Sequence, residues 1–280
     1  MSPRPNPFAL GALLLMLTLG VSLAAQTSQP HPAPQEPTDA SAQDALKHGT
    51  EAFKNARYEA AVEHFKTALV LDPASTQARQ YLGTAYASQV VPNLATPENL
   101  ATAKLAIETF KQIPEDAPEY LNALRQIAFA YRNIQQTETA KETELHVLKL
   151  DPSDPEAHYT IGVLDWQQSY RNAREILALN GITDNGNGNP TLTRSACLDL
   201  RSRNAPLVQE GLDHLTRAVD LRPTYDDAMQ YLNLTYRRRA DLACGDETRR
   251  AEDLAQADDW NRKAIATRKR SNSPAPPAAK

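Results

Sequence analysis

The sequence predicts an all-α protein built as a stack of similar helix-turn-helix units. Three segments, 71–86, 150–165 and 221–236, repeat one pattern: Leu-x-Pro, with an alanine five residues after the proline. Apolar residues recur at helical spacing around these segments. Proline marks the ends of the repeats, where its missing N–H group stops a helix. Repetition of this kind indicates a solenoid, in which each unit buries its apolar face against its neighbours.

The composition is that of an ordinary folded domain. Of the 280 residues, 41% are hydrophobic and 23% are charged, which is typical of globular proteins. The formal net charge of -4 is too small to predict binding to nucleic acid or to an acidic membrane surface. We therefore expect no nucleic-acid partner.

The N-terminus, residues 1–24, has the features of a secretory signal peptide. Arg4 gives it a positive start, residues 8–21 are uncharged and mostly apolar, and Ser22 and Ala24 are small, as a cleavage site requires. The apolar run is shorter than the roughly 20 residues that cross a bilayer. We expect cleavage, export to the periplasm or the medium, and no stable membrane span afterwards. An uncleaved membrane anchor is the alternative.

Both ends of the remaining chain are predicted to be disordered. Residues 25–41 form a linker rich in proline and polar residues, without apolar periodicity. Residues 269–280 form a tail of similar composition. Segments of this kind bury too little apolar surface to offset the entropy of folding.

Two units between these ends match a known repeat position by position. The matching positions, mostly small residues within the helix pair and a proline at its end, are Gly49, Ala61, Ala68 and Pro73, then Ala128, Ala140, Val147 and Pro152. This pattern resembles the tetratricopeptide repeat (TPR), a unit of about 34 residues. Ala52 and Glu144 depart from it, since the family has large apolar residues at their positions. The resemblance implies a right-handed α-solenoid that binds proteins and is not an enzyme.

The pattern divides residues 42–268 into five TPR-like units. We place them near 42–75, 76–120, 121–154, 155–225 and 226–268. The spacing of the repeat-ending prolines leaves about 11 extra residues in the second unit and about 37 in the fourth. We place the first insertion at 90–98 and the second at 167–205. The longer one should begin as a helix and break at 180–190, which is rich in Asn and Gly.

Both cysteines fall in segments that depart from the repeat. These residues are Cys197 and Cys244. Since an exported chain enters compartments where disulfides persist, we expect a bond between them. Two unpaired thiols remain the alternative, because geometry does not follow from sequence.

The sequence carries no recognised signature of catalysis or metal binding. The six histidines form no His-Glu-x-x-His pattern, and there is no Gly-rich phosphate loop and no Gly-x-Ser-x-Gly elbow. The surroundings of Asp184 lack the ligand spacing of a calcium-binding EF-hand. We expect no enzymatic activity, cofactor or metal. A metal-binding or catalytic protein that uses the 167–205 insertion is the weaker alternative.

The resemblance also implies where a partner would bind. In TPR arrays the first helix of each unit lines a concave groove, and its groove-facing positions give Gln80, Asn122, Arg125, Phe129, Arg132, Asn133, Tyr159, Trp166 and Arg237. Amides can hydrogen-bond a peptide backbone, arginine can bind a carboxylate, and aromatic rings can anchor side chains. We expect a scaffold for a protein or peptide that the sequence does not identify. The alternative is a structural subunit of an envelope assembly or secretion complex, which would use the opposite face.

Overall fold

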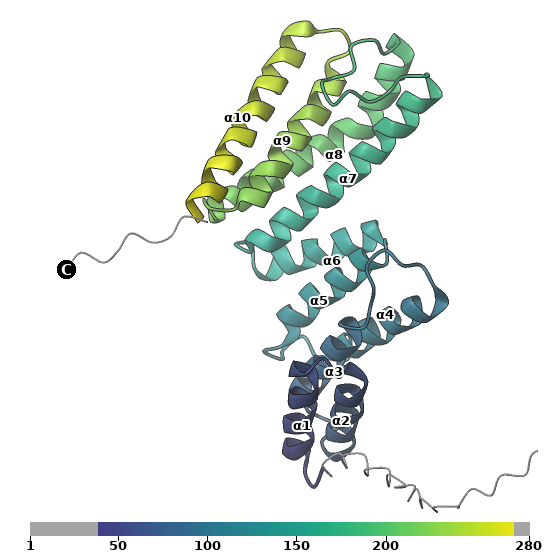
Figure 1. Ribbon diagram of the computed structural model, residues 1–280, viewed down its shortest axis with the longest axis vertical. Helices are drawn as coiled ribbons and strands as arrows, with labels where there is room; N and C mark the ends of the chain where they lie inside the picture. The colour runs from purple at the N-terminus through teal and green to yellow at the C-terminus, as the bar shows by residue number, and fades with distance from the viewer. Residues whose placement is uncertain (1–38, 272–280) are drawn as a thin grey trace, which may run out of the picture. The chain divides into compact units, whose positions relative to one another are not determined.

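The structure is a computed structural model that describes residues 39–271, and these residues are helical without any strand (Figure 1). The predicted signal peptide, most of the linker and the end of the tail lie outside the described residues. The helices are α1 (Ala42–Lys54), α2 (Tyr58–Leu71), α3 (Thr76–Ala87), α4 (Pro97–Phe110), α5 (Tyr120–Asn133), α6 (Thr137–Leu150), α7 (Pro155–Leu179), α8 (Arg194–Leu221), α9 (Asp226–Ala240) and α10 (Glu247–Ser271), with a 3-10 turn, η1, at Asp241–Ala243.

The helices pack as five successive pairs. The pairs α1–α2, α3–α4, α5–α6, α7–α8 and α9–α10 each form an extensive contact, and each meets the next pair through consecutive helices, α2 with α3 and so on (Figure 1). The prediction of an all-α solenoid of helix-turn-helix units is confirmed.

Local sequence sets where the helices begin and end. Six helices start after a side chain that accepts a hydrogen bond from a backbone N–H of the first turn: Ser41, Ser75, Thr96, Asp154, Thr193 and Asp246. The helices α2, α6 and α8 each end two residues before the repeat-ending proline, so that the residue preceding the proline is outside the helix. Proline disfavours helical backbone in the residue that precedes it, so these ends are encoded locally.

Glycine at one position of the repeat lets paired helices approach closely. A Cβ on Gly83 would lie 2.6 Å from Phe110 on α4, and one on Gly49 would collide with Phe65 on α2. In the fourth unit a Cβ on Gly162 would collide with Leu215 and lie 3.1 Å from the backbone oxygen of Gly211. Glycine therefore makes room for a phenylalanine ring of the second helix in the first two units, and for close approach to its backbone in the fourth.

The extra residues of the second unit lie in two loops rather than one. The α3–α4 loop, residues 88–96, has nine residues where the α1–α2 loop has three, and the α4–α5 loop, residues 111–119, has nine where the α2–α3 loop has four. The prediction of a single insertion at 90–98 was therefore wrong in part. Buried Asn99 fixes the first of these loops, because its side chain donates to the carbonyls of Val91 (2.9 Å) and Leu94 (2.7 Å).

The insertion of the fourth unit lengthens both of its helices. The helices α7 and α8 have 25 and 28 residues, and only residues 180–193 form a loop between them. The added turns pack together through Ala173, Ile176 and Leu177 on α7 and Leu200 on α8. The loop is fastened to α9, where Arg238 donates to Asp184 Oδ2 over 2.8 Å.

A disulfide joins two of the irregular segments. Cys197 lies in the first turn of α8 and Cys244 follows η1, with their Cα atoms 5.6 Å apart. The bond encloses 47 residues of sequence and ties the α7–α8 pair to the connection between α9 and α10.

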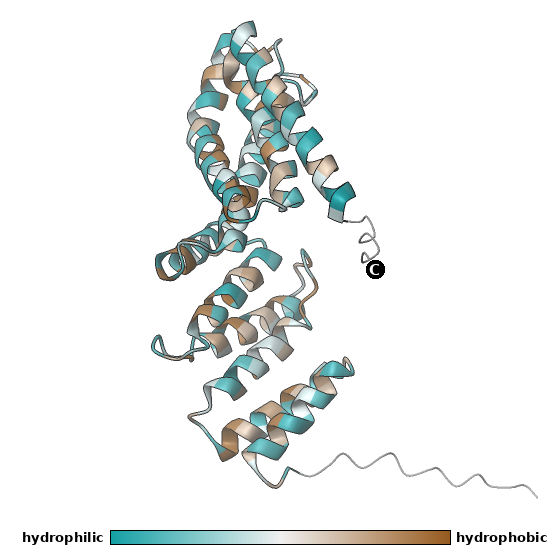
Figure 2. Cartoon of the chain, turned by 90° about the vertical axis from the view of Figure 1, so that its left-hand side faces the viewer, coloured by the Kyte–Doolittle hydropathy of each residue, from teal (hydrophilic) through white to brown (hydrophobic). Residues whose placement is uncertain are grey.

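Order extends beyond both predicted ends of the array. Asp39 to Ser41, predicted to be linker, pack against α1, and α10 runs to Ser271, past the predicted end at 268. Arg268 explains the extra turn, because it donates to Asp226 (2.6 Å) and Asp227 (3.0 Å) on α9. The helix leading to the C-terminus is largely hydrophilic (Figure 2), as suits a terminal capping helix. Within residues 39–271, no helix is both long and apolar enough to cross a membrane.

One carboxyl group is buried where the repeat would carry a large apolar residue. Glu144 on α6 is only 6% exposed. Burial raises the pKa of Glu144 to about 8, although the nearby charges of Arg132 and Arg125 act in the opposite direction. The folded protein therefore holds this side chain mostly in its protonated form at neutral pH.

The buried carboxyl predicts a loss of stability as pH rises. Glu144 must give up its proton on unfolding above about pH 4.5, so the free energy of unfolding should fall between that pH and about 8. Replacement of Glu144 by Gln should remove this loss, worth on the order of 3 kcal/mol at pH 8.5 relative to pH 5. Urea unfolding of both proteins at the two pH values measures the difference. Glu142→Gln, at an exposed neighbour, is the control and should keep the wild-type pH dependence.

The disulfide predicts a second measurable loss. In the chain-entropy picture, opening a loop of this length costs about 4 kcal/mol of stability. The double variant Cys197→Ser, Cys244→Ser should show this loss in urea unfolding, and the reduced wild-type protein should show a similar one. A wild-type protein whose stability is insensitive to reduction would contradict the bond.

Candidate functional site

Three adjoining hollows follow the first helices of the units. The first, of about 550 Å³, is bounded by α1, α2, α3 and α5. The second, of about 320 Å³, lies between α3, α5 and the 88–96 loop. The third, of about 870 Å³, lies between α5, α6 and α7. Thr84 lines the first and second hollows, and Asn133 lines the second and third. Neighbouring hollows therefore share a wall, and we refer to the three together as the groove.

The first hollow contains a buried acceptor without a partner. Gln80 is only 8% exposed, and its Oε1 atom has no hydrogen-bond partner among the described residues. An unsatisfied buried polar atom costs about 1–3 kcal/mol, so natural proteins carry few of them. The remaining walls are Thr50, Phe53, Lys54, Phe65, Tyr81, Thr84 and Asn122. The Gln80 amide therefore lies in the wall of this hollow with its Oε1 atom closed to solvent.

The second hollow contains an exposed aromatic ring. Phe129 is 40% exposed, which is unusual for its size. The guanidinium carbon of Arg132 lies 5.2 Å from the centre of the Phe129 ring. The same arginine donates to Thr160 Oγ1 on α7 over 3.3 Å. These contacts fix Phe129 and Arg132 beside each other at the junction of the second and third hollows.

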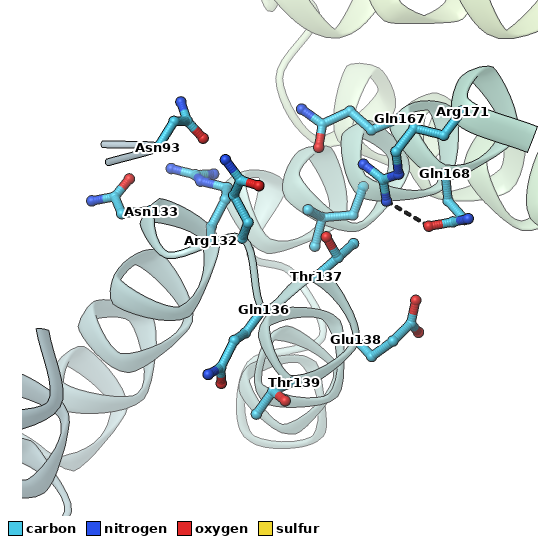
Figure 3. Close-up of a pocket in the computed structure, with 12 residues that line it drawn as sticks. Asn93, Arg132, Asn133, Gln136, Thr137, Glu138, Thr139, Gln167, Gln168 and Arg171 are labelled. Carbon is cyan, nitrogen blue, oxygen red and sulfur yellow. Dashed lines mark hydrogen bonds between the residues drawn. The ribbon is translucent and has the colours of Figure 1, made fainter. Parts of the chain in front are cut away.

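The third hollow is lined mostly by amide and guanidinium groups (Figure 3). The turn between α5 and α6 contributes Gln135 and Gln136, and the added turns of α7 contribute Gln167, Gln168 and Arg171. Among the residues that line this hollow, Glu138 carries a carboxylate, and Arg132 and Arg171 carry guanidinium groups. The local charge is therefore positive although the whole chain is negative.

The 88–96 loop completes this part of the groove. Asn93 has a left-handed backbone (φ 62°), and its N–H donates to the carbonyl of Asn133 over 2.8 Å. The loop thus lies against the C-terminal end of α5, and Asn93 lines the third hollow while Val90 and Pro92 line the second. The insertion of the second unit is therefore a wall of the groove.

The structure gathers five of the nine predicted partner-binding residues in the groove: Gln80, Asn122, Phe129, Arg132 and Asn133. Their positions come from the register of the repeat. Whether they contact a partner stays a prediction.

Arg125 has a structural role that the sequence did not indicate. Its Nε atom donates to Asp154 over 2.7 Å, and its Nη2 atom donates to Asp151 over 3.1 Å. Asp154 is buried and also caps α7. Arg125 therefore ties α5 to the turn that leads into α7, and its partners compete with any ligand carboxylate.

Tyr159 and Trp166 belong to a packed aromatic cluster rather than to the groove. The ring centre of Tyr159 lies 4.9 Å from that of Tyr225 and 5.7 Å from that of Tyr231. Trp166 stacks on Tyr170, with ring centres 5.3 Å apart. Burial, with the neighbouring Tyr231 and Asp227, raises the pKa of Tyr159 to about 12. These rings stabilise the contact of α7 with α9.

Arg237 also holds the structure together. It donates to Asn187 Oδ1 in the 180–193 loop over 2.7 Å and to Asp258 Oδ1 on α10 over 2.7 Å. Asp184, the residue considered for calcium, is bound in the same region by the buried Arg238. A fixed guanidinium therefore already balances the Asp184 carboxylate.

Sequence reasoning missed most of the third hollow, since only Arg132 and Asn133 of its twelve lining residues were predicted. Asn93, Gln167, Gln168 and Arg171 lie in the insertions, where the repeat pattern assigns no orientation. The available sequence signal for this hollow was the pair of adjacent glutamines at 135–136 and at 167–168. This signal is weak, because the repeat pattern does not show which way these side chains point.

The sequence matches no protein-family model and no curated protein. Solved structures match instead. MamA residues 41 to the end, from Desulfovibrio magneticus RS-1, align with a TM-score of 0.55 and 14% identity over 85% of this chain and 100% of that chain. A crystal structure of MamA aligns with a TM-score of 0.51 and 14% identity over 80% of this chain and 95% of that chain. YrrB, described as a TPR protein with an unusual peptide-binding site, aligns with a TM-score of 0.48 and 16% identity over 81% of this chain and 92% of that chain.

The likeness of fold rests on the MamA structures, whose TM-scores exceed 0.5. It agrees with the paired helices, the close-packed glycine position and the repeat-ending prolines. The chain has the tetratricopeptide-repeat fold.

Proposed function

We propose that the protein is a non-enzymatic scaffold that binds an extended peptide or protein segment along the groove. The observation that carries this proposal is the succession of three adjoining hollows along the first helices, lined by amide side chains, Phe129 and Arg132. An extended chain presents N–H and C=O groups at every residue. Amide side chains match both, since each carries a donor and an acceptor.

The groove offers different chemistry along its length. Phe129 supplies an aromatic surface at the centre, and Arg132 and Arg171 supply positive charge in the third hollow. Aromatic and arginine side chains are the residues that most often dominate binding energy in interfaces. We expect a bound segment to place an apolar side chain on Phe129 and an acidic one in the third hollow.

We propose an exported location for this activity. The signal-like N-terminus and the disulfide-bonded pair Cys197–Cys244 support it, because structural disulfides persist mainly in oxidising compartments.

Truncation of Phe129 should weaken peptide binding. Unstructured peptides of mixed sequence are selected on the untagged protein from a display library, and the affinity of a selected peptide is measured by fluorescence anisotropy. Phe129→Ala should raise the Kd at least about tenfold, the effect expected of an interface anchor. The matched control is Leu105→Ala, which truncates an exposed apolar side chain on α4 outside the groove, and it should leave the Kd unchanged.

The opposite pattern would contradict binding in the groove. If Leu105→Ala weakens binding and Phe129→Ala does not, the partner uses the face formed by the second helices. That result would favour the alternative of a structural subunit in an envelope assembly.

A further inference from the structure

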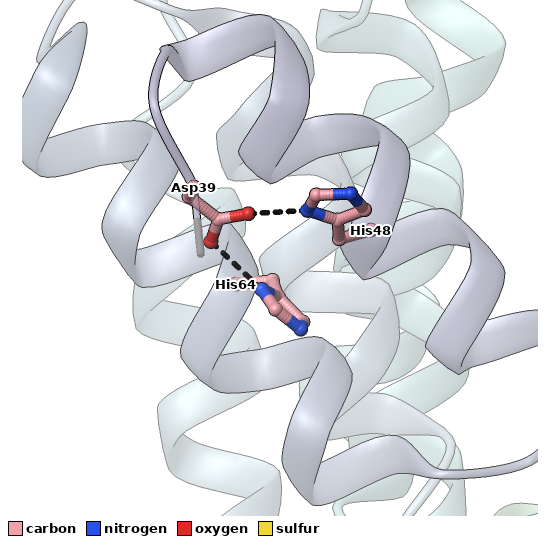
Figure 4. Close-up of side chains that lie close together, drawn as sticks. All are labelled: Asp39, His48 and His64. Carbon is pink, nitrogen blue, oxygen red and sulfur yellow. Dashed lines mark hydrogen bonds and ion pairs between the residues drawn. The ribbon is translucent and has the colours of Figure 1, made fainter. Parts of the chain in front are cut away.

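A cluster of one carboxylate and two imidazoles lies at the start of the array, away from the groove (Figure 4). The Nδ1 atom of His48 lies 2.6 Å from Asp39 Oδ1, and the Nδ1 atom of His64 lies 2.7 Å from Asp39 Oδ2. One ligand atom from each residue lies within 4.8 Å of the other two. The three side chains therefore converge on a single small volume.

The fold brings these residues together from three places. Asp39 precedes Ser41, the N-cap of α1, while His48 lies on α1 and His64 on α2. The separations of 9 and 25 residues match no metal-binding motif, so sequence inspection does not reveal the group. The packing of α1 against α2 creates it.

The cluster is shielded from solvent. The side chains of Asp39, His48 and His64 are only 7%, 19% and 11% exposed. Burial acts to raise the pKa of the Asp39 carboxyl, but hydrogen bonds from His64 and His48 outweigh it and hold the pKa below its ordinary value. The carboxylate is therefore ionised at neutral pH.

No lysine or arginine neutralises this carboxylate within the described part of the chain. The groups that lower its pKa are the two imidazoles. Asp184, Asp154 and Asp241, by contrast, are each paired with an arginine. Asp39 is thus a shielded negative charge whose described partners are two metal-binding side chains.

We propose that Asp39, His48 and His64 form a binding site for one divalent transition-metal ion of the zinc class. Two imidazole nitrogens and one carboxylate oxygen suit Zn²⁺, Co²⁺ or Ni²⁺, whereas Ca²⁺ and Mg²⁺ prefer all-oxygen sites. Tetrahedral ligands about 2.1 Å from zinc lie roughly 3.4 Å from one another. The present N···O distances of 2.6 and 2.7 Å must open by less than an ångström, which side-chain rotation provides.

Metal binding exchanges hydrogen bonds for coordination bonds. A neutral imidazole that donates from Nδ1 moves that proton to Nε2, and a charged imidazole releases a proton to solvent, so that the Nδ1 lone pair binds the ion. The bound ion would tie the chain at Asp39 to both helices of the first unit. The ion would thus have a structural role, and this proposal does not depend on whether the groove binds a peptide.

Metal titration tests the site. Zn²⁺ is added to the untagged chain and followed by calorimetry, and Co²⁺ is added and followed by its visible absorption. We expect one saturable site. Asp39→Asn, His48→Gln and His64→Gln should each weaken binding at least about tenfold, the usual loss when a metal ligand or its close support is removed. Far-ultraviolet circular dichroism checks that each variant remains helical.

The matched control is His214→Gln. His214 and His158 form the other close histidine pair described, with Nδ1 atoms 2.8 Å apart on α8 and α7. This variant should bind as the wild type does. On the wild-type protein, zinc should shift the ring resonances of two of the six histidines in NMR spectra, and the ligand variants should identify these as His48 and His64. Binding lost only in His214→Gln, binding retained in all three ligand variants, or no saturable binding would each overturn the site.

Discussion

The close approach of two helices within each unit is the constraint on which the rest of the structure depends. A single pair buries only one side of its apolar surface, so stability requires neighbours to stack without gaps. Glycine at Gly49, Gly83 and Gly162 removes the Cβ that would hold each pair apart. Because the units stack, the first helices of neighbouring units also touch, α1 with α3, α3 with α5 and α7 with α9. The groove is the surface that these helices leave between them.

The insertions add walls to the groove that a regular repeat would not have. The 88–96 loop is fixed by Asn99 and places Asn93 at the end of α5. The added turns of α7 bring Gln168 and Arg171 to the opposite wall. Neither contribution exists in a unit of ordinary length. The largest hollow therefore forms where the second and fourth units depart from the repeat.

Local signals were predictable from sequence, and long-range pairings were not. Helix ends follow from N-cap side chains and prolines, and the register of the repeat placed Gln80, Phe129 and Asn133 in the groove. The same register failed for Arg125, because Asp154, at the turn before α7, binds its guanidinium. It also did not predict that Asp39 contacts two histidines, since these residues meet only when the segment before α1 and the helices α1 and α2 pack together. A repeat pattern states which face a residue occupies, but not which distant side chain will pair with it.

Two of the polar groups that break the rules of the core lie at or near the groove, while other buried unpaired atoms lie elsewhere in the described chain. Gln80 buries an acceptor without a partner, and Glu144, whose pKa responds to Arg132, is held largely protonated at a position the repeat reserves for apolar residues. Either feature destabilises the fold on its own, so packing does not explain why the chain carries it. The Oε1 atom of Gln80 is closed to solvent, so its side chain must rotate before a ligand N–H can reach it. Any gain from that contact would therefore arise only in a bound state in which the wall of the first hollow has moved.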